Sequence, residues 1–324
     1  MYVSTSAQPR DAINNLGIYV QQQGTTCGFS GSAAWVVLSP IEQSIKRKIE
    51  SVGKPLRDWD ISINYGIKTG YNDAFIITTE RRDEILSNCK SEEERQRTEA
   101  IIRPILRGRD IKRYSYDWAG LWLIWIPWHF PLHLDPSIQG ASAEAEQAFM
   151  NQYPSVYQHL LLYKPQLSAR NKAETGIRYE WYALQRWGAN YSDDFSQPKI
   201  VWKRVGSILR FSYDKAGLLS LDSTCFAVGK DIEFICCVLN SPMGHFLLKD
   251  APQTGTGDLL VSVQAVEPLM LPSISDEDNI YFAEKIGSLS QMADNDSEQE
   301  VTECIFNLYG LNTEERNYII ANYG

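Results

Sequence analysis

The sequence has few of the side chains that hold metal ions. Its 324 residues include four histidines and six cysteines, and no two cysteines have the CxxC spacing. Reduced core cysteines are therefore the simpler interpretation. His129 and His133 could share one face of a helix, but we find no acidic partner or further histidine at ligand spacing. We predict no metal site.

Long apolar runs are also missing. The longest, from Leu121 to Pro131, is interrupted by tryptophan and histidine, and it is far shorter than the ~20 residues that span a bilayer. The first residues, MYVSTSAQPRD, lack the basic and apolar regions of a secretion signal. We therefore expect a cytoplasmic protein with no membrane partner.

Positive charge is outnumbered, but the excess of acid is local. The formal net charge is −9, from 31 basic and 40 acidic residues. From Glu267 onward the chain has twelve acidic and two basic residues, a balance of −10, which leaves about +1 for the first 266 residues. The acidity belongs to the C-terminal segment, and the remainder is nearly neutral with basic clusters.

Local patterns predict a mixture of helices and short strands. Ser39, Pro40 and Glu42 form a capped helix start, and Gly53 ends that helix. Further helices are expected after Ser91, at 142–167 in two pieces broken at Pro154, at 231–240, and two or three times after Pro272. Strands are expected at 74–78, centrally at 121–126, and at 200–204, 218–223 and 225–228. The predicted fold class is α/β in the mixed α+β sense, with one twisted mixed sheet, flanking helices and a C-terminal helical tail.

Several motifs follow one another in the order and spacing of a known family. INYGIKTGYNDAFII at 63–77 resembles its GI.TG.N.AF.I signature, and IRPILRGRDIKRY at 102–114 resembles its KP.L.G.DI.RY element. YPSVYQHL at 153–160, LSAR at 167–170 and WYAL at 181–184 are similar to its YP.I..YL, L..R and W..L stretch.

The similarity continues into the last third of the chain. DSTCF at 222–226 and VLNS at 238–241 resemble a DS..F strand and an LNS helix end, and LYGLNTEERNYI at 308–319 resembles an LYGLT..E...I ending. The family is the TaqI-like C-terminal specificity domain of adenine-specific DNA methyltransferases and fused type IIG restriction-modification enzymes. The resemblance begins near Trp35, so we expect an N-terminal extension (1–34), a target-recognition domain (35–271) and an acidic helical tail (272–324).

The resemblance implies that this chain is the DNA-reading half of an enzyme whose catalytic half binds S-adenosylmethionine and flips an adenine out of the duplex. The chain contains no glycine-rich cofactor loop after an N-terminal strand and no Asn/Asp-Pro-Pro-aromatic motif. We therefore expect no catalytic residue here, and S-adenosylmethionine and Mg²⁺ only in the missing catalytic part. Asp58, Asp60, Lys68 and Asp73 could be arranged as a nuclease site, but loop-capping acids are the simpler interpretation.

Seven cations lie within nineteen residues, a density that suits neutralisation of DNA phosphates. They are Arg95, Arg97, Arg103, Arg107, Arg109, Lys112 and Arg113. Gly108 would let a turn approach the DNA backbone, and forked guanidiniums can pair with guanine edges. A solvated basic face is the alternative. We predict DNA contacts for Arg103, Arg107, Arg109, Lys112 and Arg113, of which the last four mainly bind phosphates.

A second basic cluster is interleaved with aromatic residues. It comprises Lys164, Arg170, Lys172, Arg178, Arg186, Lys199, Lys203, Arg204 and Arg210. The polar stretch from Arg170 to Tyr182 predicts a loop or hairpin that enters a groove, where Asn171 is able to read adenine. The predicted DNA contacts are Arg170, Asn171, Lys172, Arg178, Arg186 and Lys203, with at least one base contact among the first four.

Three polar residues of the first motif, Lys68, Thr69 and Asn72, lie on its predicted turn. Asparagine and glycine favour left-handed backbone, so these residues either shape the turn or contact DNA, and the two roles can coexist.

The sequence therefore predicts a module that recognises double-stranded DNA for a restriction-modification system, together with a methyltransferase or nuclease domain or subunit. Three alternatives stay open: a stand-alone specificity subunit, a protein-interaction module that docks a catalytic partner without strong DNA binding of its own, and an enzyme with an unrecognised site. The lack of a His, Cys or paired-carboxylate constellation argues against the third. Because like charge repels phosphate, we expect the acidic tail to pack on the domain or dock a partner. Its removal after Leu271 is then expected to leave DNA affinity intact or raise it.

Overall fold

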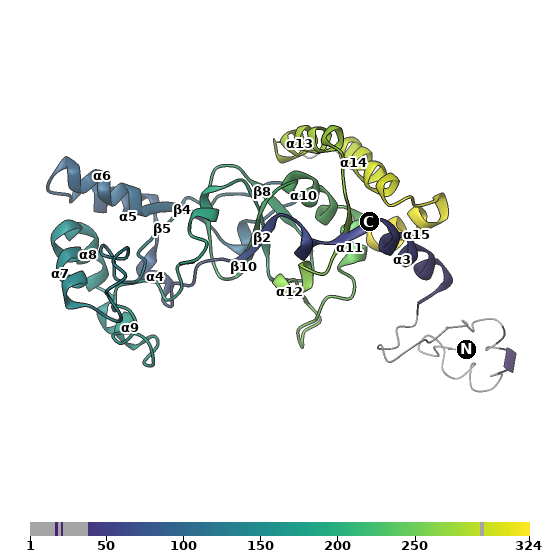
Figure 1. The fold of residues 1–324 in the computed structure, drawn as a ribbon. Coiled ribbons are helices and arrows are strands. Elements are labelled where there is room, and N and C mark those ends of the chain that lie inside the picture. Colours follow the sequence, from purple (N-terminus) through teal and green to yellow (C-terminus); the bar gives the residue numbers. More distant parts are fainter. Residues whose placement is uncertain (1–16, 19–20, 22–37, 292–294) are drawn as a thin grey trace.

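The computed structural model describes residues 17, 18, 21, 38–291 and 295–324, so most of the predicted extension lies outside the described residues. The described chain forms two lobes, each built on a four-stranded sheet. Figure 1 shows the first lobe, with helices α5 to α9, at one end and the second, with helices α13 to α15, at the other. The predicted mixed α+β class with flanking helices and a helical tail is confirmed, but the described strands divide among four sheets instead of one.

The sheet of the first lobe has the order β3-β5-β4-β9. Its strands are β3 (Ile76–Thr78), β5 (Leu121–Ile124), β4 (Ile102–Leu106) and β9 (Leu219–Ser220). β4 and β9 are parallel, and the other pairs are antiparallel. β5 lies between β3 and β4, as expected of the central strand.

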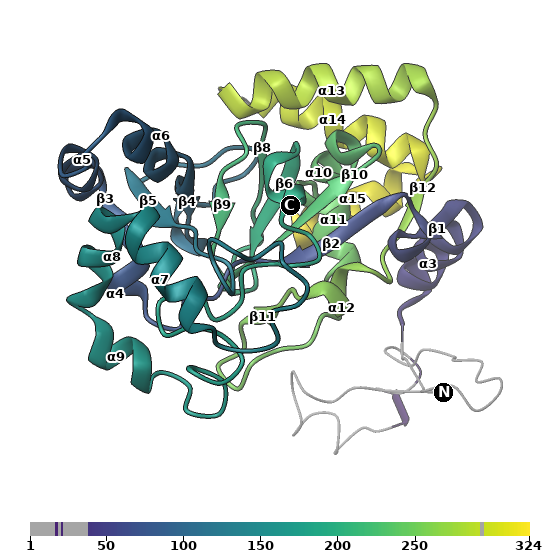
Figure 2. The ribbon, with the colours of Figure 1, turned by 60° about the vertical axis from the view of Figure 1, so that its left-hand side comes forward.

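Helices surround this sheet (Figure 2). They are α4 (Asn72–Phe75), α5 (Thr79–Ser87), α6 (Glu92–Ile101), α7 (Ala143–Gln152), α8 (Pro154–Leu161) and α9 (Lys164–Ala169). The strand predicted at 74–78 is wrong in its first half, because Thr69 Oγ1 donates to Asn72 Oδ1 at 2.6 Å and the chain makes a helical turn there. Residues 142–167 form three helices instead of two, because Pro165 starts a separate helix after Pro154 has started α8.

The sheet of the second lobe joins the two lobes. Its order is β2-β10-β6-β8, with β2 (Ile61–Tyr65), β10 (Thr224–Gly229), β6 (Lys199–Lys203) and β8 (Phe211–Asp214). Side chains alternate along a strand. On β6, Ile200 and Trp202 pack in the core of the second lobe, while Val201 packs in the core of the first. Both faces of the sheet are therefore buried.

The second lobe also contains α3 (Pro40–Val52), which has the predicted Ser39–Glu42 capping box. Its remaining helices are α10 (Ile232–Asn240), α11 (Pro242–Leu247), α12 (Val263–Val266), α13 (Asp276–Gln291), α14 (Asn295–Leu308) and α15 (Thr313–Tyr323). Two short strand pairs complete the fold: β1 (Gly53–Pro55) with β12 (Met270–Pro272), and β7 (Val205–Gly206) with β11 (Leu259–Leu260). The tail helices thus pack on the body, one of the two placements expected.

Acidification is expected to destabilise the first lobe through His159. Its buried ring places Nε2 2.9 Å from the Ala74 carbonyl oxygen and Nδ1 3.1 Å from Arg81 Nε, so Nδ1 accepts and the ring is neutral. Burial, reinforced by the charge of Arg81, lowers the pKa of His159 below the ordinary histidine value of about 6.5. Below pH 6.5 the unfolded chain therefore binds a proton that the folded chain does not. The free energy of unfolding therefore decreases as the pH is lowered.

Urea unfolding between pH 7.5 and 5 measures this loss. A His159→Gln variant cannot be protonated, so its stability should vary less over that range. Burial also lowers the pKa values of His133 and His245, which remain in both proteins and supply the residual slope. An unchanged slope in the variant would contradict the assignment.

Candidate nucleic-acid interface

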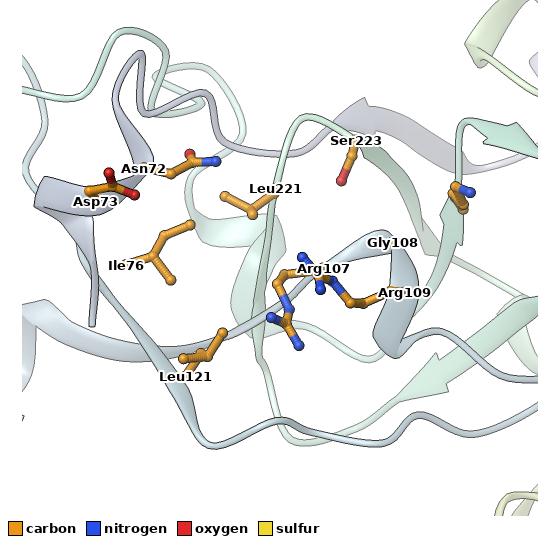
Figure 3. Close-up of a pocket in the computed structure, with 10 residues that line it drawn as sticks. Asn72, Asp73, Ile76, Arg107, Gly108, Arg109, Leu121, Leu221 and Ser223 are labelled. Carbon is orange, nitrogen blue, oxygen red and sulfur yellow. The ribbon is translucent and has the colours of Figure 1, made fainter. Parts of the chain in front are cut away.

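A cleft lies between the two lobes and consists of two adjoining hollows. The larger, about 580 Å³, is lined by α4, the turn Gly108–Asp110, the start of β5, the end of β6 and the segment 221–223 (Figure 3). The smaller, about 200 Å³, continues toward Ile208 and Arg210. The two share Gly108, Arg109 and Lys203, so we treat them as one cleft.

The cleft brings together residues from motifs that are far apart in the sequence. Asn72 comes from the first motif, Arg107 and Arg109 from the second, and Ser223 from the DSTCF motif. Lys203, at the end of β6, reaches the same space. Four predicted DNA-contact residues, Asn72, Arg107, Arg109 and Lys203, therefore line one surface.

Three cations of the cleft are exposed: Arg109, Lys203 and Arg210. Within residues 38–291 and 295–324, none of these three cations has a side-chain hydrogen bond or an ion pair. Arg107 differs, because its guanidinium binds both carboxylate oxygens of Asp110, at 3.0 and 2.8 Å. Hydrogen bonding to Asp110 raises the pKa of Arg107. Arg107 thus fixes the turn, and the cleft cations remain available to a ligand.

Gly108 makes room for one of these cations. A Cβ atom at this position would lie 3.0 Å from Cγ of Lys203. The glycine was expected to let the turn approach DNA, and the structure adds that it leaves space for the lysine stem across the cleft.

A second basic patch surrounds Tyr65 and borders the cleft. Lys68 and Arg186 exchange two backbone hydrogen bonds of 2.9 Å, and the guanidiniums of Arg186 and Arg204 lie 5.7 and 5.0 Å from the Tyr65 ring centroid. Asp222 connects the patch to the cleft, because its N–H donates to the Ile67 carbonyl and its own carbonyl accepts from Arg204.

Arg170 is half-buried and does not line the cleft. Its guanidinium donates to the carbonyls of Thr69, at 2.6 Å, and of Trp181 and Ala183. Burial lowers the pKa of Arg170 to about 10. Arg170 therefore holds the turn of the first motif, to which the buried Thr69 also belongs, and a DNA contact by either residue stays a prediction.

The rest of the 171–178 loop is partly engaged within itself. Asn171 Nδ2 donates to Glu174 at 2.6 Å, and Arg178 forms a 2.9 Å ion pair with the same carboxylate. Lys172 is exposed. None of the three lines the cleft, so the structure does not join them to the first cluster.

The remaining predicted contacts have partners within the protein. Arg103 donates to Ser196 Oγ and the Gly217 carbonyl, and burial lowers its pKa. Lys112 pairs with Asp117 at 3.2 Å. Arg113 pairs with Glu298 of the tail at 2.9 Å and donates to the Asn240 carbonyl.

Sequence reasoning did not select Arg204, Arg210, Tyr65 and Ser223. Both arginines belong to the second basic cluster, which was the available signal, but charge density along the chain does not tell which cations face a common cleft.

In the described part of the chain, no group of three or more His, Cys, Asp or Glu residues is placed to hold a metal ion, and no helix is long and apolar enough to cross a membrane.

The chain thus has a mixed α+β fold with a basic cleft between its lobes. Residues 103–260 match the family model of the TaqI-like C-terminal specificity domain, which confirms the resemblance found in the sequence. No curated protein matches the chain.

Among solved structures, the type IIL restriction-modification enzyme MmeI in complex with DNA is similar with 13% identity and a TM-score of 0.49, over 83% of this chain and 35% of that one. The type IIG restriction endonuclease BpuSI is similar with 13% identity and a TM-score of 0.46, over 85% of this chain and 33% of that one. This chain therefore spans about a third of the length of both.

Proposed function

We propose that this chain is the sequence-specific double-stranded DNA recognition module of a restriction-modification system, and that the cleft binds the DNA. The observation that carries the proposal is the set of cleft cations, Arg109, Lys203 and Arg210, which lack partners among the described residues and line one continuous space. Cations held in this way neutralise phosphates and release counterions.

The distribution of acid supports the same surface. The tail carries most of the net negative charge, and its helices pack against α10 in the core of the second lobe, whereas Val201 and Phe226 face the first lobe from the other side of the sheet. The acidic helices are thus separated from the first lobe by the sheet, and repulsion of phosphate from the cleft is weak.

Methyl transfer and cleavage belong, in this proposal, to another part of the system. A methyltransferase or nuclease domain or subunit would supply S-adenosylmethionine binding, Mg²⁺ and the chemistry, and this chain would position it on DNA in the cytoplasm. Two of its known structural neighbours are about three times longer than the matched region, which leaves space for such a part.

Alanine substitution of the cleft cations is expected to weaken DNA binding uniformly. Arg109→Ala, Lys203→Ala and Arg210→Ala each remove one phosphate contact, so each should reduce the slope of log K against log salt by about one on cognate and random duplexes alike. If a cation contacts a base instead, its substitution by alanine should cost roughly 1–3 kcal/mol of binding free energy on the cognate duplex alone.

Fluorescence anisotropy at several salt concentrations measures both quantities, with the cognate duplex obtained by selection from a random pool. Lys230→Ala is the matched control, because Lys230 is exposed at the opposite end of β10 from Ser223. If all three variants keep the affinity, salt slope and preferred sequence of the parent, the DNA surface lies elsewhere. A parent chain that binds no duplex would favour a protein-interaction module instead.

A further inference from the structure

We propose that Ile208 recognises the C5-methyl group of a thymine in the major groove. The inference rests on the proposed function and deepens it, because it assigns one element of sequence reading to a residue that neither the family match nor the basic clusters single out.

Ile208 is an exposed apolar side chain in a basic setting. It is 64% exposed and lies on the loop between β7 and β8. It lines the smaller hollow together with the three cleft cations and with Gly206 and Ser207. Water offers an apolar side chain among cations no favourable contact. On DNA, phosphates that bind the cations flank base edges, which the apolar side chain can contact.

Both ends of the loop that carries Ile208 are anchored to the protein. At the first end, Val205 and Gly206 pair with Leu260 and Leu259 of β11. At the second, Phe211 N–H donates to Asn240 Oδ1 at 3.0 Å, and Asn240 Nδ2 donates to the Phe211 carbonyl at 2.7 Å.

The residue after Ile208 fixes the direction of its side chain. Leu209 packs against the core of the second lobe, so its neighbour Ile208 is directed to solvent. A β-branched side chain has few rotamers to lose on binding. Ile208 is therefore presented to a ligand instead of folding back onto the protein.

The chemistry of the DNA edge decides which group Ile208 meets. In the major groove, base pairs present hydrogen-bond donors and acceptors and one apolar group, the thymine methyl, which apolar side chains contact. Arg109, Lys203 and Arg210 line the hollow together with Ile208, so a duplex whose phosphates they bind would bring base edges within reach of its side chain. Its contact is therefore a thymine methyl, with no hydrogen bond involved.

Deoxyuridine substitution tests this contact, because it removes only the methyl group. In the selected cognate duplex, each thymine is replaced in turn and affinity is measured for the full chain and for Ile208→Ala. At one position the parent should lose about fourfold in affinity, the effect of exposing one methyl group. Ile208→Ala should bind the thymine and deoxyuridine duplexes equally at that position.

Ile177→Ala is the matched control. Ile177 is 62% exposed on the 171–178 loop and does not line the cleft, so this variant should keep the thymine dependence of the parent.

Retained thymine dependence in Ile208→Ala, no sensitive thymine, or a cognate site without thymine would each overturn the assignment while DNA binding persists. Loss of base stacking at the site, reported by 2-aminopurine fluorescence in the parent but not in Ile208→Ala, would overturn it in favour of a wedge between base steps. Absence of binding to any duplex would overturn the proposed function and this inference together.

Discussion

Removal of residues 272–324 is expected to unfold the rest of the chain instead of improving its DNA binding. In the described part of this tail, nine apolar side chains are buried in the core of the second lobe: Phe282, Ile286, Leu289, Val301, Ile305, Phe306, Tyr309, Leu311 and Ile319. Each contributes roughly 1.5–3 kcal/mol, so that together they equal or exceed the net stability of about 5–15 kcal/mol that a domain possesses. The tail is thus part of the core.

Polar contacts add to this loss. Buried Glu315 of α15 accepts from Lys48 Nζ at 2.6 Å and from Ser44 Oγ at 2.8 Å, both on α3. Truncation after Leu271 would therefore also release α3. Circular dichroism and urea unfolding of the truncated chain measure the effect, and a cooperative transition like that of the parent would contradict it.

The charge of the tail is better tested with the tail in place. Glu277, Glu284 and Glu314 are exposed, so replacing all three with glutamine removes three negative charges and leaves the buried face intact. This triple variant should keep its unfolding midpoint and bind DNA as well as the parent or more tightly at low salt. The triple variant therefore tests the expectation that the negative charge of the tail weakens DNA binding. The truncation cannot test it, because charged and core residues alternate on the same helices and are removed together.

Local signals in the sequence predicted the elements that depend on local chemistry. The capping box at Ser39 and the helix after Ser91 require only residues three positions apart, and both are present. The turn at Thr69 and Asn72 was also predicted from local residues, but its helical continuation through Phe75 was not, because the apolar pattern of 74–78 equally suits a buried strand. The predicted strand is present only at 76–78, and half-buried Arg170, about a hundred positions away, adds a tertiary contact to the turn through the Thr69 carbonyl.

The candidate site was predictable only in part for the same reason. Arg109 and Arg113 are equivalent in a basic cluster, yet one is exposed in the cleft and the other pairs with Glu298, 185 positions later. Arg170 and Lys203 differ likewise: the first is bound to three carbonyls inside the protein, and the second has no such partner in the described chain. Charge density identified the segments, and the fold decides which of their cations face the cleft.

Loss of Asp214 is expected to be the most damaging single substitution in the sheet that joins the lobes. Lys199 and Asp214 are directly opposite each other on β6 and β8, their side chains are fully buried, and Lys199 Nζ lies 2.6 Å from Asp214 Oδ2. Removing one partner of a buried pair costs about 3–5 kcal/mol, because the other charge stays uncompensated.

The two residues are not equivalent, which makes the prediction sharper. Asp214 also accepts from the N–H groups of Ala216 and Leu218, at 2.8 and 2.9 Å, and from Tyr116 Oη. Among the described residues, the Lys199 ammonium group has one further partner besides Asp214, the Phe195 carbonyl. Asp214→Leu should therefore destabilise the chain more than Lys199→Met, and the double variant should recover part of the loss by removing the unpaired cation.

The pH dependence of these variants separates loss of the ion pair from loss of packing. Burial lowers the pKa of Lys199, and Asp214 opposes that shift, so in Asp214→Leu the pKa of Lys199 falls further below its unfolded value of 10.5. Above this lowered pKa the folded chain releases the proton that the unfolded chain still binds, so stability rises with pH up to the unfolded value.

Urea unfolding from pH 7 to 9.5 should therefore show Asp214→Leu gaining stability relative to the double variant, which has no lysine there. Parallel pH profiles for the two would mean that Asp214 acts only by accepting hydrogen bonds from the backbone N–H groups of Ala216 and Leu218. These hydrogen bonds hold the turn 216–218, which precedes β9 and the cleft-lining segment 221–223, so in either case the damage would reach the cleft.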